Sequence, residues 1–120
     1  MPEIKDKKYG KTLFYIDGNE IKDKKYGTTL FYIDGEEVKE KSKYGLVKFY
    51  VNGNEIKEKS KNGNTRYYID RDEVKEKSKY GSLRYYIDGS EIKDKKYGNV
   101  KYYIDGSLTR DQLYGFFSII

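Results

Sequence analysis

Carboxylates recur along this chain every 17 or 18 residues, and their oxygens are the ligands that a hard cation such as Ca²⁺ prefers. A symmetric ring of such acids would be a candidate metal site at one end of a repeating fold. The plainer interpretation is a solvated rim, because a lysine follows each acid two or three positions later. In addition, every repeated residue of a closed repeating fold forms a ring, so a ring alone does not indicate a site. The acids are Asp6, Asp23, Glu40, Glu58, Glu76 and Asp94.

A second recurring set combines tyrosine with lysine and arginine, which is the chemistry of a surface that binds phosphorylated headgroups or stacked bases. Alternatively, tyrosine is present as a good strand former, and neighbouring glutamates neutralise the lysines. Tyrosines expected to point outward are Tyr15, Tyr32, Tyr50, Tyr68, Tyr86 and Tyr103. The candidate binding residues within this set are Tyr50, Tyr68, Tyr86, Lys48, Arg66, Arg84, Lys57, Lys75 and Lys93.

The composition argues against an enzyme. Cysteine and histidine are both absent, which excludes disulfides, thiol nucleophiles, imidazole metal ligands and the commonest general base. The sequence contains no phosphate-binding glycine loop and no nucleophile elbow. Six equivalent acids without an evident cleft do not resemble the paired carboxylates of a glycosidase. We therefore expect neither catalysis nor a cofactor.

The 25 basic and 20 acidic residues give a net charge of +5 and are interleaved along the chain. This balance attracts anions mildly, whereas a dedicated nucleic-acid binder usually concentrates its cations in one segment. Residues 1–10 contain acids and lack an apolar core, and no later stretch is apolar enough to span a bilayer. We expect a cytoplasmic monomer without a signal peptide or a transmembrane segment.

Internal repetition is the strongest structural signal. Each unit carries a Tyr-Gly or Asn-Gly pair and, in five copies, an Asp-Gly or Asn-Gly pair after an aromatic run. Two turn signals in each unit predict two strands, and so a twelve-strand antiparallel meander in one domain, residues 1–120. The six copies span 3–19, 20–36, 37–54, 55–72, 73–90 and 91–107.

The Asp17-Gly18 pair and its counterparts predict two-residue type I′ turns. Such a turn places Phe14 opposite Ile21, with isoleucine, valine and phenylalanine on one face and tyrosine, glutamate and lysine on the other. The same register brings like charges together, which is unfavourable and hints that a bound anion compensates them. The predicted basic pairs are Lys48 with Lys57, Arg66 with Lys75, and Arg84 with Lys93.

The fourth copy has Asp70-Arg71 where the others have a glycine. Arg71 must then take a positive φ at a cost of about 1 kcal/mol. We expect a local distortion at this turn.

A meander with one apolar face and no helices between its strands must close on itself, which also removes exposed edges. Twelve strands leave a central void that side chains alone do not fill. Residues 108–120 are predicted to fill it as an apolar helix, with Thr109 and Gln112 at capping-box spacing and Gly115 allowing close approach to a strand. A releasable membrane-inserting helix is the alternative. The predicted plug residues are Leu113, Phe116, Phe117 and Ile120.

The sequence thus predicts an all-β closed antiparallel twelve-strand barrel of six tandem hairpins with a central C-terminal helix. Tandem units of the type YGxxxFYIDGxEIK, followed by a short apolar helix, resemble the bacterial β-flower families, which are similar to the Tubby C-terminal-like barrel. The resemblance covers essentially the whole chain. It implies this fold, no established function, and, by analogy with the Tubby-like proteins, lipid binding.

We therefore expect a non-enzymatic binding module for an anionic partner, with lipid headgroups first. A protein–protein interaction or scaffold role is the leading alternative. Sequence-independent binding of single-stranded nucleic acid stays open, because its surface chemistry would be similar.

Overall fold

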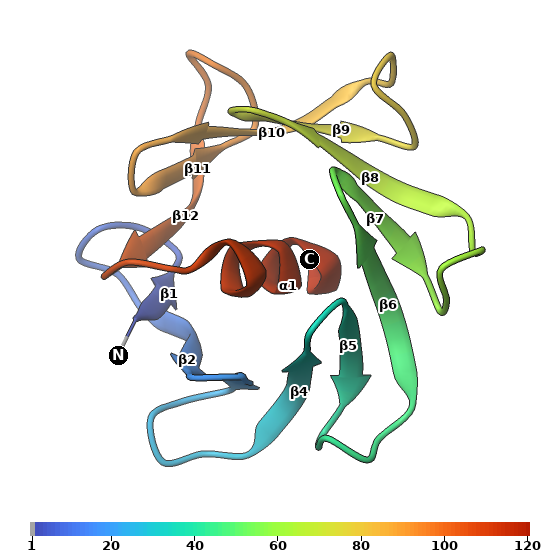
Figure 1. Cartoon of the computed structure of the whole chain (residues 1–120). Coiled ribbons are helices and arrows are strands. Elements are labelled where there is room, and N and C mark those ends of the chain that lie inside the picture. Colours follow the sequence, from blue (N-terminus) through green and yellow to red (C-terminus); the bar gives the residue numbers. More distant parts are fainter. Residues whose placement is uncertain (1) are drawn as a thin grey trace.

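The computed structural model describes residues 2–120. Its twelve strands form one closed antiparallel barrel in chain order, in which the first strand pairs with the last. A single helix follows the last strand and lies within the ring, as Figure 1 shows. The elements are β1 (Glu3–Lys5), β2 (Thr12–Asp17), β3 (Glu20–Lys22), β4 (Thr29–Asp34), β5 (Glu37–Glu40), β6 (Val47–Asn52), β7 (Glu55–Glu58), β8 (Thr65–Asp70), β9 (Glu73–Glu76), β10 (Leu83–Asp88), β11 (Glu91–Lys93), β12 (Val100–Asp105) and α1 (Arg110–Ile119).

The closed twelve-strand barrel is confirmed, but the predicted hairpin register is wrong. Asp17 pairs with Glu20, and Ile16 rather than Phe14 pairs with Ile21. The turn residues are therefore Gly18 and Asn19, with a positive φ of 59° at the glycine alone. Glycine at the first turn position is the pattern of a type II′ turn, whereas type I′ needs positive φ at both positions. The pairing moves by two residues, so each side chain keeps its predicted face.

The turn of the fourth copy follows the same pattern without glycine. Arg71 takes a φ of 59°, as predicted. The pairing of β8 with β9 nevertheless has no register shift between the Asp70–Glu73 pair at the turn and the Tyr67–Glu76 pair. The expected distortion therefore does not reach the strands.

Each longer strand contains a β-bulge opposite the short strand that precedes it, and the sequence did not predict this bulge. Lys5 pairs with Thr12 and Ile4 with Phe14, so Leu13 is the extra residue of β2. The same shift recurs in every copy. A bulge bends its strand and redirects a side chain. The bulged residues are Leu13, Leu30, Lys48, Arg66, Arg84 and Lys101.

The inward face carries the predicted isoleucine, valine and aromatic core. Near the two-residue turns it is lined by buried residues such as Ile16, Ile21 and Val74. Nearer the longer loops it carries an aromatic layer: Phe14, Phe31, Phe49, Tyr67, Tyr85 and Tyr102. On the outward face, Tyr15 is only 5% exposed, although it was expected to face solvent.

The helix α1 begins at the predicted capping box. The Gln112 amide donates to Thr109 Oγ1 at 3.2 Å, and the Thr109 amide donates to Gln112 Oε1 at 3.0 Å. These bonds satisfy two amides that the first turn of a helix leaves without partners. The chain therefore enters the ring with its first helical turn already stabilised.

The helix fills the centre of the barrel with its aromatic side chains. Phe116 and Phe117 are fully buried, whereas the predicted plug residues Leu113 and Ile120 are half-buried at the edge of the core. A Cβ on Gly115 would lie 2.7 Å from Ile33 Cδ1, which confirms the predicted close approach to a strand. The helix packs against the strands, and among the described residues no helix has the length and apolarity needed to cross a membrane.

Candidate functional site

The antiparallel topology gathers all six longer loops at one end of the barrel, here called the loop end. Figure 1 shows them at the outer margin of the ring. The two-residue turns lie at the opposite end, here called the turn end. The loops that define the loop end are 6–11, 23–28, 41–46, 59–64, 77–82 and 94–99.

A tyrosine stands at the tip of five of these loops and is almost fully exposed. The exposed fractions lie between 89% and 92% for Tyr9, Tyr26, Tyr44, Tyr80 and Tyr97. A lysine ammonium lies 5.5 to 5.6 Å from the ring centroid in three of these loops. Large exposed aromatic side chains are a mark of an interaction surface when they cluster.

Sequence reasoning missed these loop tyrosines as functional residues. In the sequence the Tyr-Gly pair predicts only a turn, and the candidate binding tyrosines are those of the strands. The available signal was a difference between the copies: Asn62 occupies the tyrosine position in the fourth copy. A turn that accepts asparagine does not need an aromatic ring, so tyrosine in the other copies calls for a different explanation.

The six acids of the proposed metal ring serve different structural purposes. Asp6, Asp23 and Asp94 each accept a hydrogen bond from a loop amide at 2.9 Å. Glu40 forms an ion pair with Lys48 at 3.0 Å. Within residues 2–120, no group of three acids comes together in a way that would hold a metal ion. Glu58 and Glu76 lie at the strand ends beside the loops.

The predicted outer stripe exists, but its charges are arranged differently. Tyr50 pairs with Lys57, Tyr68 with Lys75, and Tyr86 with Lys93. The predicted basic pairs Lys48 with Lys57, Arg66 with Lys75 and Arg84 with Lys93 are therefore wrong. The cause is the position of the turn, which occupies Gly18-Asn19 instead of Asp17-Gly18 and so shifts the pairing by two residues. Like charges facing each other in these ladders consequently give no evidence for a bound anion.

The strand lysines are instead tied into the fold. Their side chains are only 17 to 21% exposed and form ion pairs with strand acids: Lys57 with Glu55, Lys75 with Glu73, and Lys93 with Asp88. Lys57 and Lys75 also donate to loop carbonyls at 3.0 Å. A hydrogen bond to Asp88 raises the pKa of Lys93. These lysines fasten the loops to the strands.

Three tyrosines of the outer stripe, Tyr50, Tyr68 and Tyr86, are half-buried, and each is paired with one of these lysines. The Tyr50 hydroxyl donates to Glu36 at 2.9 Å, and this bond raises the pKa of Tyr50 above its ordinary value. Tyr50, Tyr68 and Tyr86 therefore lie beside neutralised lysines rather than beside free cations.

The bulged cations occupy a different place, at the loop end, and the two arginines among them lie over the aromatic layer. The Arg66 guanidinium lies 5.5 Å from the Phe49 ring and 5.2 Å from the Tyr67 ring, and that of Arg84 lies 5.3 Å from the Tyr85 ring. We call the bulged cations Lys48, Arg66, Arg84 and Lys101 the basic arc. The two remaining bulged positions, Leu13 and Leu30, are apolar.

Arg66 also holds the end of the central helix. Its Nη2 donates to the Ile120 carbonyl at 2.8 Å, and the Tyr67 hydroxyl donates to the same oxygen at 3.0 Å. The Nε of Arg66 is buried without a hydrogen-bond partner among the described residues. A hydrogen bond between Arg84 and Tyr67 raises the pKa of Arg84. Burial raises the pKa of Tyr85.

Three clefts open between the hairpins along the basic arc. The first, of about 360 Å³, is lined by Glu58, Thr65, Arg66, Tyr67, Glu76, Lys77 and Arg84. The second, of about 490 Å³, is lined by Leu46, Val47, Lys48, Phe49, Glu58, Lys59 and Arg66. The third, of about 430 Å³, is lined by Leu13, Arg84, Tyr85, Asp94, Lys101 and Tyr102.

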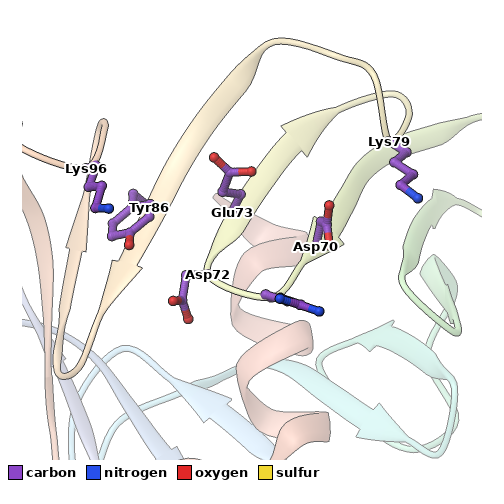
Figure 2. Close-up of a pocket in the computed structure, with 7 residues that line it drawn as sticks. Asp70, Asp72, Glu73, Lys79, Tyr86 and Lys96 are labelled. Atoms are coloured by element: carbon purple, nitrogen blue, oxygen red, sulfur yellow. The ribbon is translucent and has the colours of Figure 1, made fainter.

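A further cleft, of about 520 Å³, lies on the outer face beside the turn of the fourth copy. Figure 2 shows the carboxylates of Asp70, Asp72 and Glu73 between Lys79 and Lys96, with Tyr86 at the side. Arg71 also lines this cleft, so three acids balance three cations and give no net attraction for an anion. This cleft includes one predicted binding residue, Tyr86, which lies beside Lys96 in Figure 2.

No protein-family model, curated protein or solved structure matches the chain. The fold is nevertheless a closed barrel of repeated hairpins, consistent with the β-flower-like architecture that the repeat resembles.

Proposed function

We propose that this chain is a non-enzymatic binding module whose loop end contacts an anionic surface, in the first place the headgroups of an anionic lipid bilayer. The observation that carries the proposal is the set of five loop tyrosines, each about nine-tenths exposed and flanked by lysine. The loops are a better candidate than the outer stripe, whose lysines are already paired with acids.

The loop chemistry favours a membrane interface. Tyrosine is enriched where a bilayer meets water, because its ring is apolar and its hydroxyl is polar. Each lysine near an anionic leaflet contributes about 1 kcal/mol of attraction. Every loop carries two or three lysines, and the aspartates among them are engaged with loop amides.

The placement of the loops supports contact at several points. Because they surround one end of the barrel, a surface that meets one loop is close to its neighbours. Weak contacts at neighbouring loops then reinforce one another through their high effective concentration. This arrangement suits an extended partner better than a small molecule.

Co-sedimentation with lipid vesicles tests the proposal. The purified chain should bind vesicles that contain phosphatidylglycerol and not vesicles of phosphatidylcholine alone. Binding should weaken steeply between about 50 and 500 mM salt, because surface charges are screened. Equal binding to both vesicle types, or no binding to either, would contradict the proposal.

A single-stranded oligonucleotide included as a competitor separates lipid binding from general attraction to polyanions. Lipid binding that persists against an oligonucleotide of equal charge supports the proposal. Complete displacement favours the nucleic-acid alternative, and the absence of both activities favours a protein partner.

A further inference from the structure

The basic arc breaks the symmetry of an otherwise regular repeat. The bulged position is leucine in the first two copies and lysine or arginine in the other four. The inward aromatic layer is phenylalanine in the first three copies and tyrosine in the last three. Leucine forms the same bulge, so the bulge does not require a cation. The asymmetry therefore calls for an explanation outside the backbone.

The two arginines of the arc lie on neighbouring hairpins and line the same cleft of about 360 Å³ with Tyr67 and Lys77. Arg66 lies against the Tyr67 ring, and Arg84 interacts with the Tyr67 side chain from the next hairpin. The cleft thus has a tyrosine between two guanidinium groups. Planar guanidinium groups match the oxygens of phosphate by forming paired hydrogen bonds.

Both arginines make contacts within the fold, Arg66 with Ile120 and the Tyr67 ring and Arg84 with the Tyr85 ring, but neither charge is neutralised by an acidic side chain of residues 2–120. Among the described residues, neither Arg66 nor Arg84 forms an ion pair with an aspartate or glutamate, whereas the strand lysines do. The buried Nε of Arg66 also has no acceptor. An unsatisfied buried donor is costly, so the side chain of Arg66 is not fully satisfied by the groups around it.

Two acids oppose this binding and give the inference a sharp test. Glu58 and Glu76 line the same cleft, and a carboxylate near a bound anion lowers its affinity. Glu76 is exposed at the end of β9, so its charge can be removed without disturbing the core.

We propose that the cleft between Arg66 and Arg84 binds a phosphate group, either free or as the monoester of a lipid headgroup. This inference rests on the proposed function, because it assigns one specific anion site to the end of the barrel that contacts an anionic surface. The cleft lies beside the contact of Arg66 with Ile120, so bound phosphate and the helix end share one arginine.

Isothermal titration of the full chain with inorganic phosphate is the direct test. Arg84→Gln should weaken binding about ten-fold or more, because a charge-assisted hydrogen bond is lost. Arg71→Gln, which removes the same charge at the turn end, is the matched control and should bind like the parent. Glu76→Gln should bind more tightly. Equal affinity of Arg84→Gln and the parent, or no phosphate binding at all, would overturn the inference.

Because Arg66 holds the end of the helix, Arg66→Gln removes a structural contact together with the charge, and Arg84→Gln is therefore the decisive variant. Its thermal unfolding should match that of the parent, which separates loss of binding from loss of structure. A fully folded Arg84→Gln protein that still binds phosphate like the parent contradicts the proposed site.

Vesicles distinguish the two sources of phosphate and the two proposals. Tighter binding to phosphatidic acid than to phosphatidylglycerol at equal surface charge, lost in Arg84→Gln, identifies the lipid monoester. Phosphate binding without vesicle binding supports the cleft and identifies free phosphate, but contradicts the bilayer function. Vesicle binding without phosphate binding overturns the cleft and leaves the bilayer function intact.

Discussion

At the scale of single residues, small departures from the repeat have the clearest physical consequences. Arg71 replaces the turn glycine of the other copies and takes a φ of 59°, which glycine adopts freely and arginine does not. The side chain is exposed and belongs to a cleft of mixed charge. The strain at this turn is therefore not compensated by burial.

Replacing Arg71 by glycine should stabilise the protein by about 0.5 to 1 kcal/mol, the relief of backbone strain less the added freedom of the unfolded chain. Urea unfolding of the two proteins measures the difference. Gly53→Ala is the reverse change at an equivalent turn, where a Cβ meets no atom within 4 Å, and should destabilise. An Arg71→Gly protein less stable than the parent would show that the arginine side chain stabilises this turn.

Tyr85 gives a prediction about pH. Burial raises the pKa of its hydroxyl above the ordinary value of 10, so the folded state disfavours phenolate relative to the unfolded state. The contribution of Tyr85 to the free energy of unfolding therefore keeps its full value below pH 10 and decreases as the pH rises from 10 through the raised pKa of Tyr85. Because the pKa of Tyr50 is raised as well, absorbance titration of phenolate should show one late-titrating tyrosine fewer in Tyr85→Phe than in the parent. An unchanged titration in that variant would contradict the assignment.

At the scale of elements, the strand faces and the helix were predictable, and the turn geometry was not. Alternation of apolar and polar residues assigned Ile16 and Ile21 to the core, and this assignment survives a two-residue change in pairing. The turn could be formed by Asp17-Gly18 or by Gly18-Asn19, and the sequence alone does not choose between them. The β-bulge leaves no compositional mark, because leucine, lysine and arginine all occupy it.

The helix α1 should be necessary for cooperative folding, since Phe116 and Phe117 fill the centre of the barrel. A chain that ends after Gly106 should lose its sharp thermal transition, measured by calorimetry or near-ultraviolet circular dichroism. Gly115→Ala is a milder variant, because the added methyl meets Ile33, and should destabilise by about 1 to 3 kcal/mol. A truncated chain that melts like the parent would contradict the central role of the helix.

At the scale of the whole molecule, the barrel separates two ends with different chemistry. The loop end carries exposed tyrosines, loop lysines and the basic arc, whereas the turn end carries the two-residue turns and the start of α1. The candidate site was only partly predictable from the sequence. The sequence identified tyrosine and basic residues as the relevant chemistry, but closure of the barrel and the bulges decided which of them lie together at the loop end.

The most direct test of the central claim compares vesicle binding by two variants that each remove one charge. Lys25→Gln changes a loop lysine beside Tyr26, and Arg71→Gln changes the turn end. At low salt and with phosphatidylglycerol vesicles, Lys25→Gln should weaken binding about five-fold, the equivalent of about 1 kcal/mol, while Arg71→Gln binds like the parent. Equal weakening by both variants would show attraction to net charge without a preferred face, and would contradict the claim that the loop end is the binding surface.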